Sequence, residues 1–248
     1  WNDRRRPMRF WLLILFSLTV DASEIGEISE LSGTGEINRV DSDIKLDATI
    51  SSDIFSFDDV RTGNGRLAIQ FLDDSVVKLT EHSKLVIDEF IYDPDPAKSK
   101  LALNMASGTA RFITGKLGLI NKENISIKTP TASIGIRGTD FTATVDELGR
   151  SLIILLPNAD GTSSGEITVT TAMGVEILNE AFQATMVSAW EQEPTPAVTL
   201  GGMTLGMIDN MLIIQKPREV AQAIEEQELG VSPTAELDKD FFEDAPDL

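Results

Sequence analysis

Short apolar runs, separated by clusters of turn residues, are the feature of this chain that most limits its possible folds. Turn sequences such as Gly63-Asn64-Gly65 and Asp73-Asp74-Ser75 stand between the runs. Short strands with a turn about every eight to twelve residues are typical of all-β folds. The sequence therefore predicts an all-β domain over residues 25–190 that is solenoid-like or sandwich-like. The chain has no exact sequence repeat, so the pattern does not support a regular propeller. The runs that we expect to form strands include residues 67–72, 76–80, 85–91, 101–105, 125–129, 141–145, 152–156, 167–171 and 175–178.

Composition supports a folded, acidic protein. Hydrophobic residues make up 42% of the 248 residues, which is enough to build a core. The formal net charge of −19 repels nucleic-acid phosphates, so we expect no nucleic-acid binding. The chain has no cysteine, which excludes disulfides, thiolate metal sites and cysteine nucleophiles.

The N-terminal segment resembles a secretory signal peptide. Four arginines lie within residues 4–9, an apolar run follows over residues 10–20, and Ala22 provides a small side chain for cleavage. The run is shorter than the roughly 20 residues that a membrane-spanning helix needs. We expect residues 1–22 to be removed, translation to start at Met8, and the mature chain to be exported in a Gram-negative bacterium without a transmembrane helix. The alternatives are a buried strand and an uncleaved anchor.

The composition changes after residue 190. Prolines and acidic residues over 191–202 predict a linker, and residues 203–248 predict an acidic accessory tail that is partly helical or disordered. An alternative is that the apolar stretch 203–213 lies across an open end of the β domain.

Residues 127–141, IKTPTASIGIRGTDF, have a pattern that carries its own structural prediction. Pro130 pushes the residue before it towards an extended conformation. In the strand that follows, alternate residues face opposite sides, so Ile134 and Ile136 share a buried face while Gly135 and Arg137 share the other. Gly138 permits a turn before the next buried residue. The Arg137 side chain suits bonds to carbonyls or a carboxylate at this turn, and ligand binding is its alternative role.

This segment is similar to a stretch typical of the FecR domain, a sensory module of FecR-type regulators that also occurs in many exported proteins. Residues 72–92 and 103–115 resemble two further parts of that domain, with Asp74 where a glycine is usual. The resemblance implies an all-β fold for residues 25–190. FecR-type regulators also have a cytosolic sigma-factor-binding region and a transmembrane helix, which we do not find here, so we expect the exported part alone. The matching positions, for which we expect structural roles, are Thr129, Pro130, Ile134, Gly135, Ile136, Arg137, Gly138, Thr139 and Phe141.

Residues with catalytic potential do not form a recognisable pattern. His82 is the only histidine, and a lone histidine of this kind is usually a surface residue. The clusters Asp41, Asp43 and Asp47, and Asp93 and Asp95, could bind calcium, but aspartate also favours turns. We therefore expect no enzyme and no cofactor, with calcium as the alternative.

Together these features predict a non-catalytic exported envelope protein that binds or scaffolds a protein or polymer partner in the periplasm or at the cell surface. The first alternative is a periplasmic signal-sensing component related to FecR-type sigma-factor regulation. The second is a hydrolase acting on envelope polymers.

Overall fold

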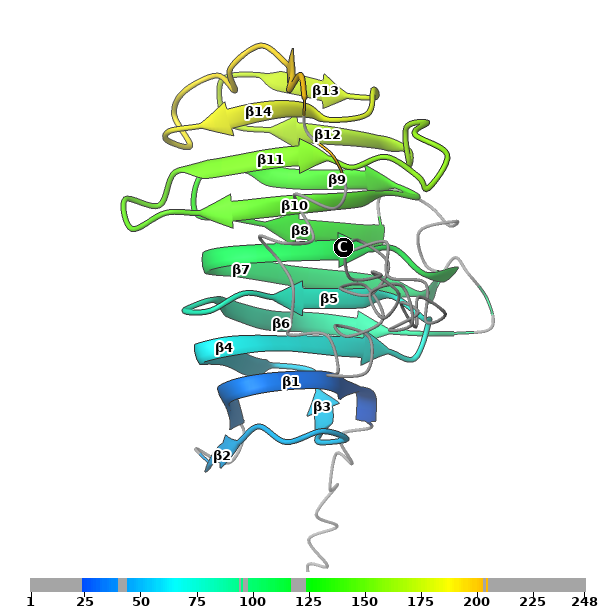
Figure 1. Cartoon of the computed structure of the whole chain (residues 1–248), viewed down its shortest axis with the longest axis vertical. Helices are drawn as coiled ribbons and strands as arrows, with labels where there is room; N and C mark the ends of the chain where they lie inside the picture. Colours follow the sequence, from blue (N-terminus) through cyan, green and yellow to red (C-terminus); the bar gives the residue numbers. More distant parts are fainter. Residues whose placement is uncertain are drawn as a thin grey trace, which may run out of the picture.

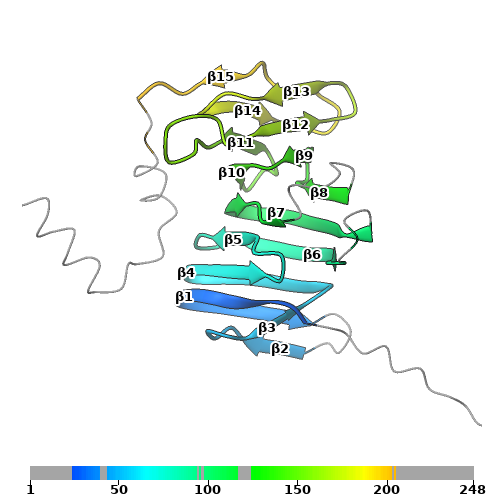
Figure 2. The ribbon, with the colours of Figure 1, turned by 90° about the vertical axis from the view of Figure 1, so that its right-hand side faces the viewer.

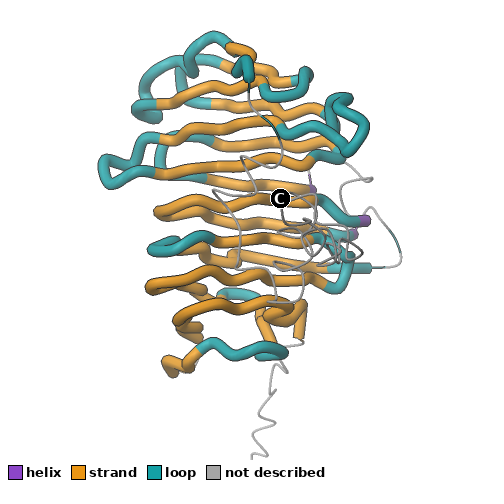
Figure 3. Tube along the Cα trace, in the orientation of Figure 1, coloured by secondary structure: helices purple, strands orange, loops and turns teal. Residues whose placement is uncertain are grey.

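The computed structural model describes residues 24–39, 44–93, 95, 98–116, 124–202 and 204. Within these ranges the protein contains no α-helix, and the small purple marks in Figure 3 are isolated 3-10 residues, which confirms the all-β part of the predicted fold class. Its strands are β1 (Glu24–Arg39), β2 (Ile44–Asp47), β3 (Asp53–Phe55), β4 (Asp58–Phe71), β5 (Val76–Leu79), β6 (Lys84–Ile91), β7 (Lys100–Ile113), β8 (Ile125–Lys128), β9 (Ser133–Arg137), β10 (Asp140–Val145), β11 (Ser151–Leu155), β12 (Glu166–Thr170), β13 (Val175–Leu178), β14 (Gln183–Val187) and β15 (Val198–Thr199).

A single hydrogen-bonded sheet runs through the molecule and folds over on itself. The long strand β7 pairs with β6 and β8 through its first half, and with β5 and β10 through its second half. From there one arm continues through β9, β12 and β13, and the other through β11, β14 and β15. Figures 1 and 2 show the two arms as stacked layers. We call the layer formed by β5, the second half of β7, β10, β11, β14 and β15 the front layer. The layer formed by β6, the first half of β7, β8, β9, β12 and β13 is the back layer.

The long strands bend where they pass between the layers, and glycine makes the bend possible. Gly33 of β1 and Gly65 of β4 are register partners with φ angles of +80° and +148°. A Cβ atom on Gly33 would lie 1.9 Å from the Asn64 carbonyl oxygen, and one on Gly65 would lie 2.0 Å from that of Ser32. Only glycine can occupy this pair of positions without moving the neighbouring backbone.

The core lies between the two layers and follows the alternation of the strands. Inward side chains are mostly Ile, Leu and Val, and Phe141 is the largest that is fully buried. Its ring stacks on that of Phe112, with centroids 4.9 Å apart, and Phe71 stacks on Phe90 at 5.2 Å. The alternating pattern of the sequence therefore becomes one continuous apolar interior.

The strands extend beyond the segment that the sequence predicts as the domain. Part of the expected linker 191–202 forms β15, which pairs with β14, and Pro194 in the same segment is buried. The Thr195 amide donates to the Met186 carbonyl at 2.9 Å. The predicted signal peptide and nearly all of the predicted tail lie outside the described residues. Within the described ranges, we find no helix long and apolar enough to cross a membrane.

Candidate functional site around residues 127–141

The predicted segment 127–141 carries the chain along the back layer and then across to the front layer. It includes the end of β8, all of β9 and the start of β10. Thr129 and Ala132 close the turn between β8 and β9, with the Thr129 amide donating to the Ala132 carbonyl at 2.9 Å. The inward residues Ile134 and Ile136 are buried, as predicted.

Buried hydroxyl groups connect this turn to the opposite layer. The Ser151 hydroxyl of β11 donates to the Thr129 Oγ1 atom at 2.7 Å, and it lies 2.7 Å from the Thr131 hydroxyl. Thr131 also donates to the Val187 carbonyl of β14 at 3.3 Å. Because buried polar groups need partners, these bonds fix the β8–β9 turn against the front layer.

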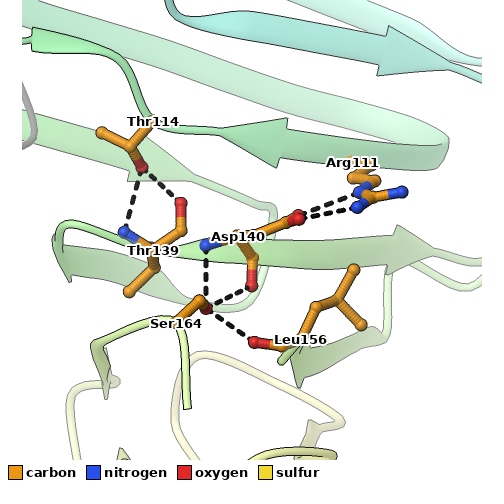
Figure 4. A network of polar contacts seen from close by, with 6 residues as sticks. All are labelled: Arg111, Thr114, Thr139, Asp140, Leu156 and Ser164. Atoms are coloured by element: carbon orange, nitrogen blue, oxygen red, sulfur yellow. Dashed lines mark hydrogen bonds and ion pairs between the residues drawn. The ribbon is translucent and has the colours of Figure 1, made fainter. Parts of the chain in front are cut away.

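The crossing from β9 to β10 depends on Gly138 and Thr139. Gly138 has a φ of +56°, as the turn prediction required. Thr139 then makes three bonds with Thr114 after β7: its carbonyl accepts from the Thr114 amide at 3.1 Å and hydroxyl at 2.6 Å, and its amide donates to that hydroxyl at 3.2 Å. Figure 4 shows this pair at the left of the network.

Asp140, the next residue, is held on two sides (Figure 4). The Arg111 guanidinium of β7 donates from Nε to Oδ1 at 2.9 Å and from Nη2 to Oδ2 at 2.6 Å. The Ser164 hydroxyl accepts from the Asp140 amide at 3.0 Å and donates to the Leu156 carbonyl at 2.6 Å. A two-point guanidinium–carboxylate contact sets orientation as well as distance, so it fixes the start of β10 relative to β7.

The sequence did not identify Arg111, Asp140 or Ser164 as important, and assigned the tying role to Arg137. Arg137 instead is exposed and, in the part of the chain that the structure describes, forms no hydrogen bond or ion pair through its side chain. In this network Arg111 and Asp140 are 29 residues apart, and Asp140 and Ser164 are 24 residues apart. The pairing of β7 with β10 brings Arg111 to Asp140, and Ser164 reaches Asp140 from the loop between β11 and β12, so no local pattern could have revealed these contacts.

Gly135 lies on the outer face of the back layer, and its backbone does not require glycine. Its φ is not positive, and an added Cβ would meet Thr168 at ordinary contact distances of 3.8 and 3.9 Å. Thr168 of β12 pairs with it in register, and Ile177 of β13 pairs with Thr168. We call the row Gly135, Thr168 and Ile177 the outer row. A strand glycine without a conformational reason often marks the close approach of another group.

A compact ion-pair cluster lies near the other end of the back layer. Asp59 accepts from Arg61 at 2.6 Å and is 3.2 Å from the Lys84 ammonium, and its side chain is 12% exposed. Burial alone would raise the pKa of Asp59, but the hydrogen bonds from Arg61 and Lys84 outweigh it and hold this pKa below its usual value.

The residues considered for catalysis and metal binding remain separate. His82 is exposed in the turn after β5, where its amide donates to the Gly63 carbonyl at 3.1 Å. The Asp93 carboxylate accepts from the Asp95 amide at 2.8 Å, which is the turn-forming role of aspartate. Among the described residues no three His, Cys, Asp or Glu side chains are grouped to hold a metal, and Asp41 and Asp43 lie outside those residues.

The family comparison agrees with the segment that organises this site. Residues 58–157 match the family model described as FecR protein. This part of the chain is a FecR domain. It includes β4 to β11, and with them the crossing at Gly138 and the Arg111–Asp140 contact, so the resemblance noted in the sequence is confirmed for these residues.

Other comparisons add less to the FecR assignment. No curated protein matches the chain. Two crystal structures of a candidate anti-sigma factor from Parabacteroides distasonis, at 2.50 and 1.65 Å resolution, are similar to it with 13% and 12% sequence identity. Each comparison covers 70% of this chain and 92% of the other, with a TM-score of 0.43. A likeness this low does not support a function for the chain.

Proposed function

We propose that this protein is a non-catalytic binding module of the bacterial cell envelope, related to FecR-type regulation. The observation that carries the proposal is the FecR domain at residues 58–157, which makes up the centre of the two-layer fold. Such domains occur in sensory proteins, where binding, not chemistry, is the expected activity. The partner that we propose is a protein or polymer of the envelope.

The division of roles within the 127–141 segment supports a binding function. Its inward residues build the core, and its buried threonines fix the turn and the layer crossing. Its outward residues Gly135 and Arg137 take part in neither task. Because the scaffold beneath is fixed by hydrogen bonds, it can present these outward positions to a partner in a constant geometry.

Export is part of the proposal and rests on residues 4–22. Expressed from Met8 in a Gram-negative host, the protein is expected in the periplasm with a new N-terminus at or near Ser23. Fractionation followed by N-terminal sequencing tests this. Recovery of the full-length chain in the cytosol would contradict both the signal peptide and the envelope location.

Recovery of a partner from intact envelopes tests the binding role. The variant Gly135→Gln places a long side chain on the outer face, and the open contacts around Gly135 leave room for it. We expect it to lower the yield of a cross-linked partner at least fivefold. The control Leu152→Gln changes a half-exposed residue of β11 in the front layer and is expected to leave the yield unchanged. Equal yields from both variants would place the binding surface elsewhere, and hydrolysis of envelope polymers by the pure protein would contradict the proposal.

A role as a signal-sensing component is the second candidate, and the FecR domain is the observation in its favour. The two candidates differ in their genetic context. A neighbouring gene for a sigma factor or an outer-membrane receptor, with loss of target transcription on deletion of this protein, would favour the sensing role.

A further inference from the structure

The C-terminal end of the back layer finishes on an open strand edge. β13 pairs with β12 in an unbroken antiparallel register, in which Thr170 faces Val175 and Thr168 faces Ile177. On its other side, no described strand pairs with β13 (Figures 1 and 2). β13 therefore ends the sheet at this point.

The backbone of β13 directs hydrogen-bonding groups outward from this edge. The Thr171 amide donates to the Gly174 carbonyl at 2.9 Å and closes the turn between β12 and β13. In antiparallel pairs, bonded and non-bonded positions alternate. Val175 and Ile177 therefore occupy non-bonded positions, and their N–H and C=O groups point away from β12. No hydrogen bond to these groups occurs within the described part of the chain.

The outward side chains along this edge are apolar and about half exposed or more. Val175 is 57% exposed and Ile177 49%, and Met173 in the preceding turn is 60% exposed. Ile177 is also the last member of the outer row that begins at Gly135. An added strand would extend this row by one position and cover the apolar side chains at its end.

An inward-pointing charge is one way in which proteins block pairing at an edge, and Glu176 is inward. Here, however, its carboxylate accepts from the Ala197 amide at 2.8 Å. The charge is thus held by the segment that follows β14. β13 itself contains no proline, lysine or bulge that would oppose pairing.

The chain segment that contains this edge carries charge of one sign. Residues 151–202 contain six acidic residues and neither lysine nor arginine. Glu176 belongs to β13, and the Glu193 side chain packs over Gly174, with its Cγ 3.1 Å from the position of an added Cβ. A second copy of this acidic end would be repelled, as would the acidic residues 219–248, whereas a cationic chain would be attracted.

We infer that β13 is the docking site for an extended segment of a protein partner, in which apolar residues alternate with lysine or arginine, and that this segment adds to the sheet as a further strand. Strand addition of this kind satisfies the outward backbone groups of Val175 and Ile177, and the alternating side chains supply the specificity. The inference rests on the proposed binding function and names the partner's chemistry.

A pair of peptides tests the inference on the full chain. The probe is a nine-residue peptide of alternating valine and lysine, and its control alternates valine and glutamate. We expect saturable binding of the lysine peptide that weakens as salt is added, at least tenfold weaker binding of the glutamate peptide, and at least tenfold slower hydrogen exchange at the Val175 and Ile177 amides. Binding that leaves both amides unprotected would overturn the inference, since it would report attraction to acidic residues elsewhere.

A matched pair of variants completes the test. Ile177→Pro removes an outward N–H without breaking a β12–β13 bond, and Ile177→Val keeps both that N–H and an apolar side chain. We expect the proline variant to bind the lysine peptide at least tenfold more weakly and the valine variant to bind within twofold of the parent. If the proline variant unfolds, the amide exchange of the unaltered chain decides. A concentration-dependent dimer that protects the same amides would assign the edge to a second copy and overturn the inference. Recovery of an envelope partner equally by the parent and a folded Ile177→Pro variant would also overturn it, and would leave the proposed function standing.

Discussion

Replacing Phe141 with alanine measures how much the core depends on the end of the 127–141 segment. The Phe141 side chain is fully buried, and its ring stacks on Phe112 at 4.9 Å with an angle of 15° between the planes. Truncating a buried phenylalanine to alanine costs about 3–5 kcal/mol through lost burial and the cavity left behind. The stacked pair accounts for roughly 0.5–1.5 kcal/mol of this loss.

Urea unfolding followed by circular dichroism gives the free energy directly, and thermal melting provides a second measure. For a folded region of this size, about 2–4 °C is lost per kcal/mol, so the Tm is expected to fall by about 6–20 °C. Phe141→Leu keeps most of the volume and should lose less, about 1–1.5 kcal/mol. Leu148→Ala, at a residue that is 77% exposed, should stay within about 0.5 kcal/mol of the parent.

A double-mutant cycle with Phe112→Leu isolates the ring contact. If the two rings stabilise one another, the second substitution should cost less once the first is present, by roughly the 0.5–1.5 kcal/mol assigned to stacking. A loss below about 1 kcal/mol for Phe141→Ala, comparable to that of the exposed Leu148 control, would refute the core assignment.

Four further changes test other parts of the structure. Gly138→Val forces a branched residue to a φ of +56° and should destabilise the fold by about 1–3 kcal/mol in urea unfolding, whereas unchanged unfolding would refute the turn. Asp140→Asn removes the carboxylate from its guanidinium partner and should cost about 1.5–3 kcal/mol by the same measurement, and a neutral result would show that the contact does not hold β10. The Asp59 carboxyl has a lowered pKa in the folded state, so its stabilising effect should be complete above its unfolded pKa of about 3.9 and be lost as the pH falls through the folded pKa. The Asp59→Asn variant should therefore lose less free energy of unfolding than the parent between about pH 5 and pH 2. Parallel profiles of stability against pH for the two proteins would contradict this. A chain ending at Trp190 lacks β15 and should unfold more easily, by about 1–3 kcal/mol, than one ending at Gly202, and equal stability would restore the linker interpretation.

The sequence by itself determined the fold class and most of the core. Alternating apolar runs bounded by turn residues are sufficient to predict strands, because a period of two is compatible with one buried face of a sheet and with no other regular structure. The inward positions Ile134 and Ile136 followed from this period, and the re-entry of Phe141 followed from the turn expected at Gly138; all three residues are buried. The turn at Gly138 was also local information, since a glycine at that place permits a backbone conformation that other residues avoid.

The contacts that hold distant strands together could be seen only in the tertiary structure. Arg111 and Asp140 are 29 residues apart and meet because β7 and β10 are neighbours in the front layer. Arg137 looked equally suited to the same role in the sequence, yet it is exposed and its side chain has no hydrogen-bond or ion-pair partner among the described residues. A one-dimensional pattern gives the side of a strand on which a residue lies, but not which strand becomes its neighbour, because register and strand order depend on the whole sheet.

The same reason applies to the open edge at β13. Its sequence, Val-Glu-Ile-Leu, resembles that of the interior strands, and nothing in it indicates a position at the end of the sheet. The sheet folds over at β7 and places β13 at the end of one arm, so the outward backbone groups of β13 have no neighbouring strand among the described residues. Local chemistry determined which residues form strands, and the global order of those strands decided which backbone groups remain available to a partner.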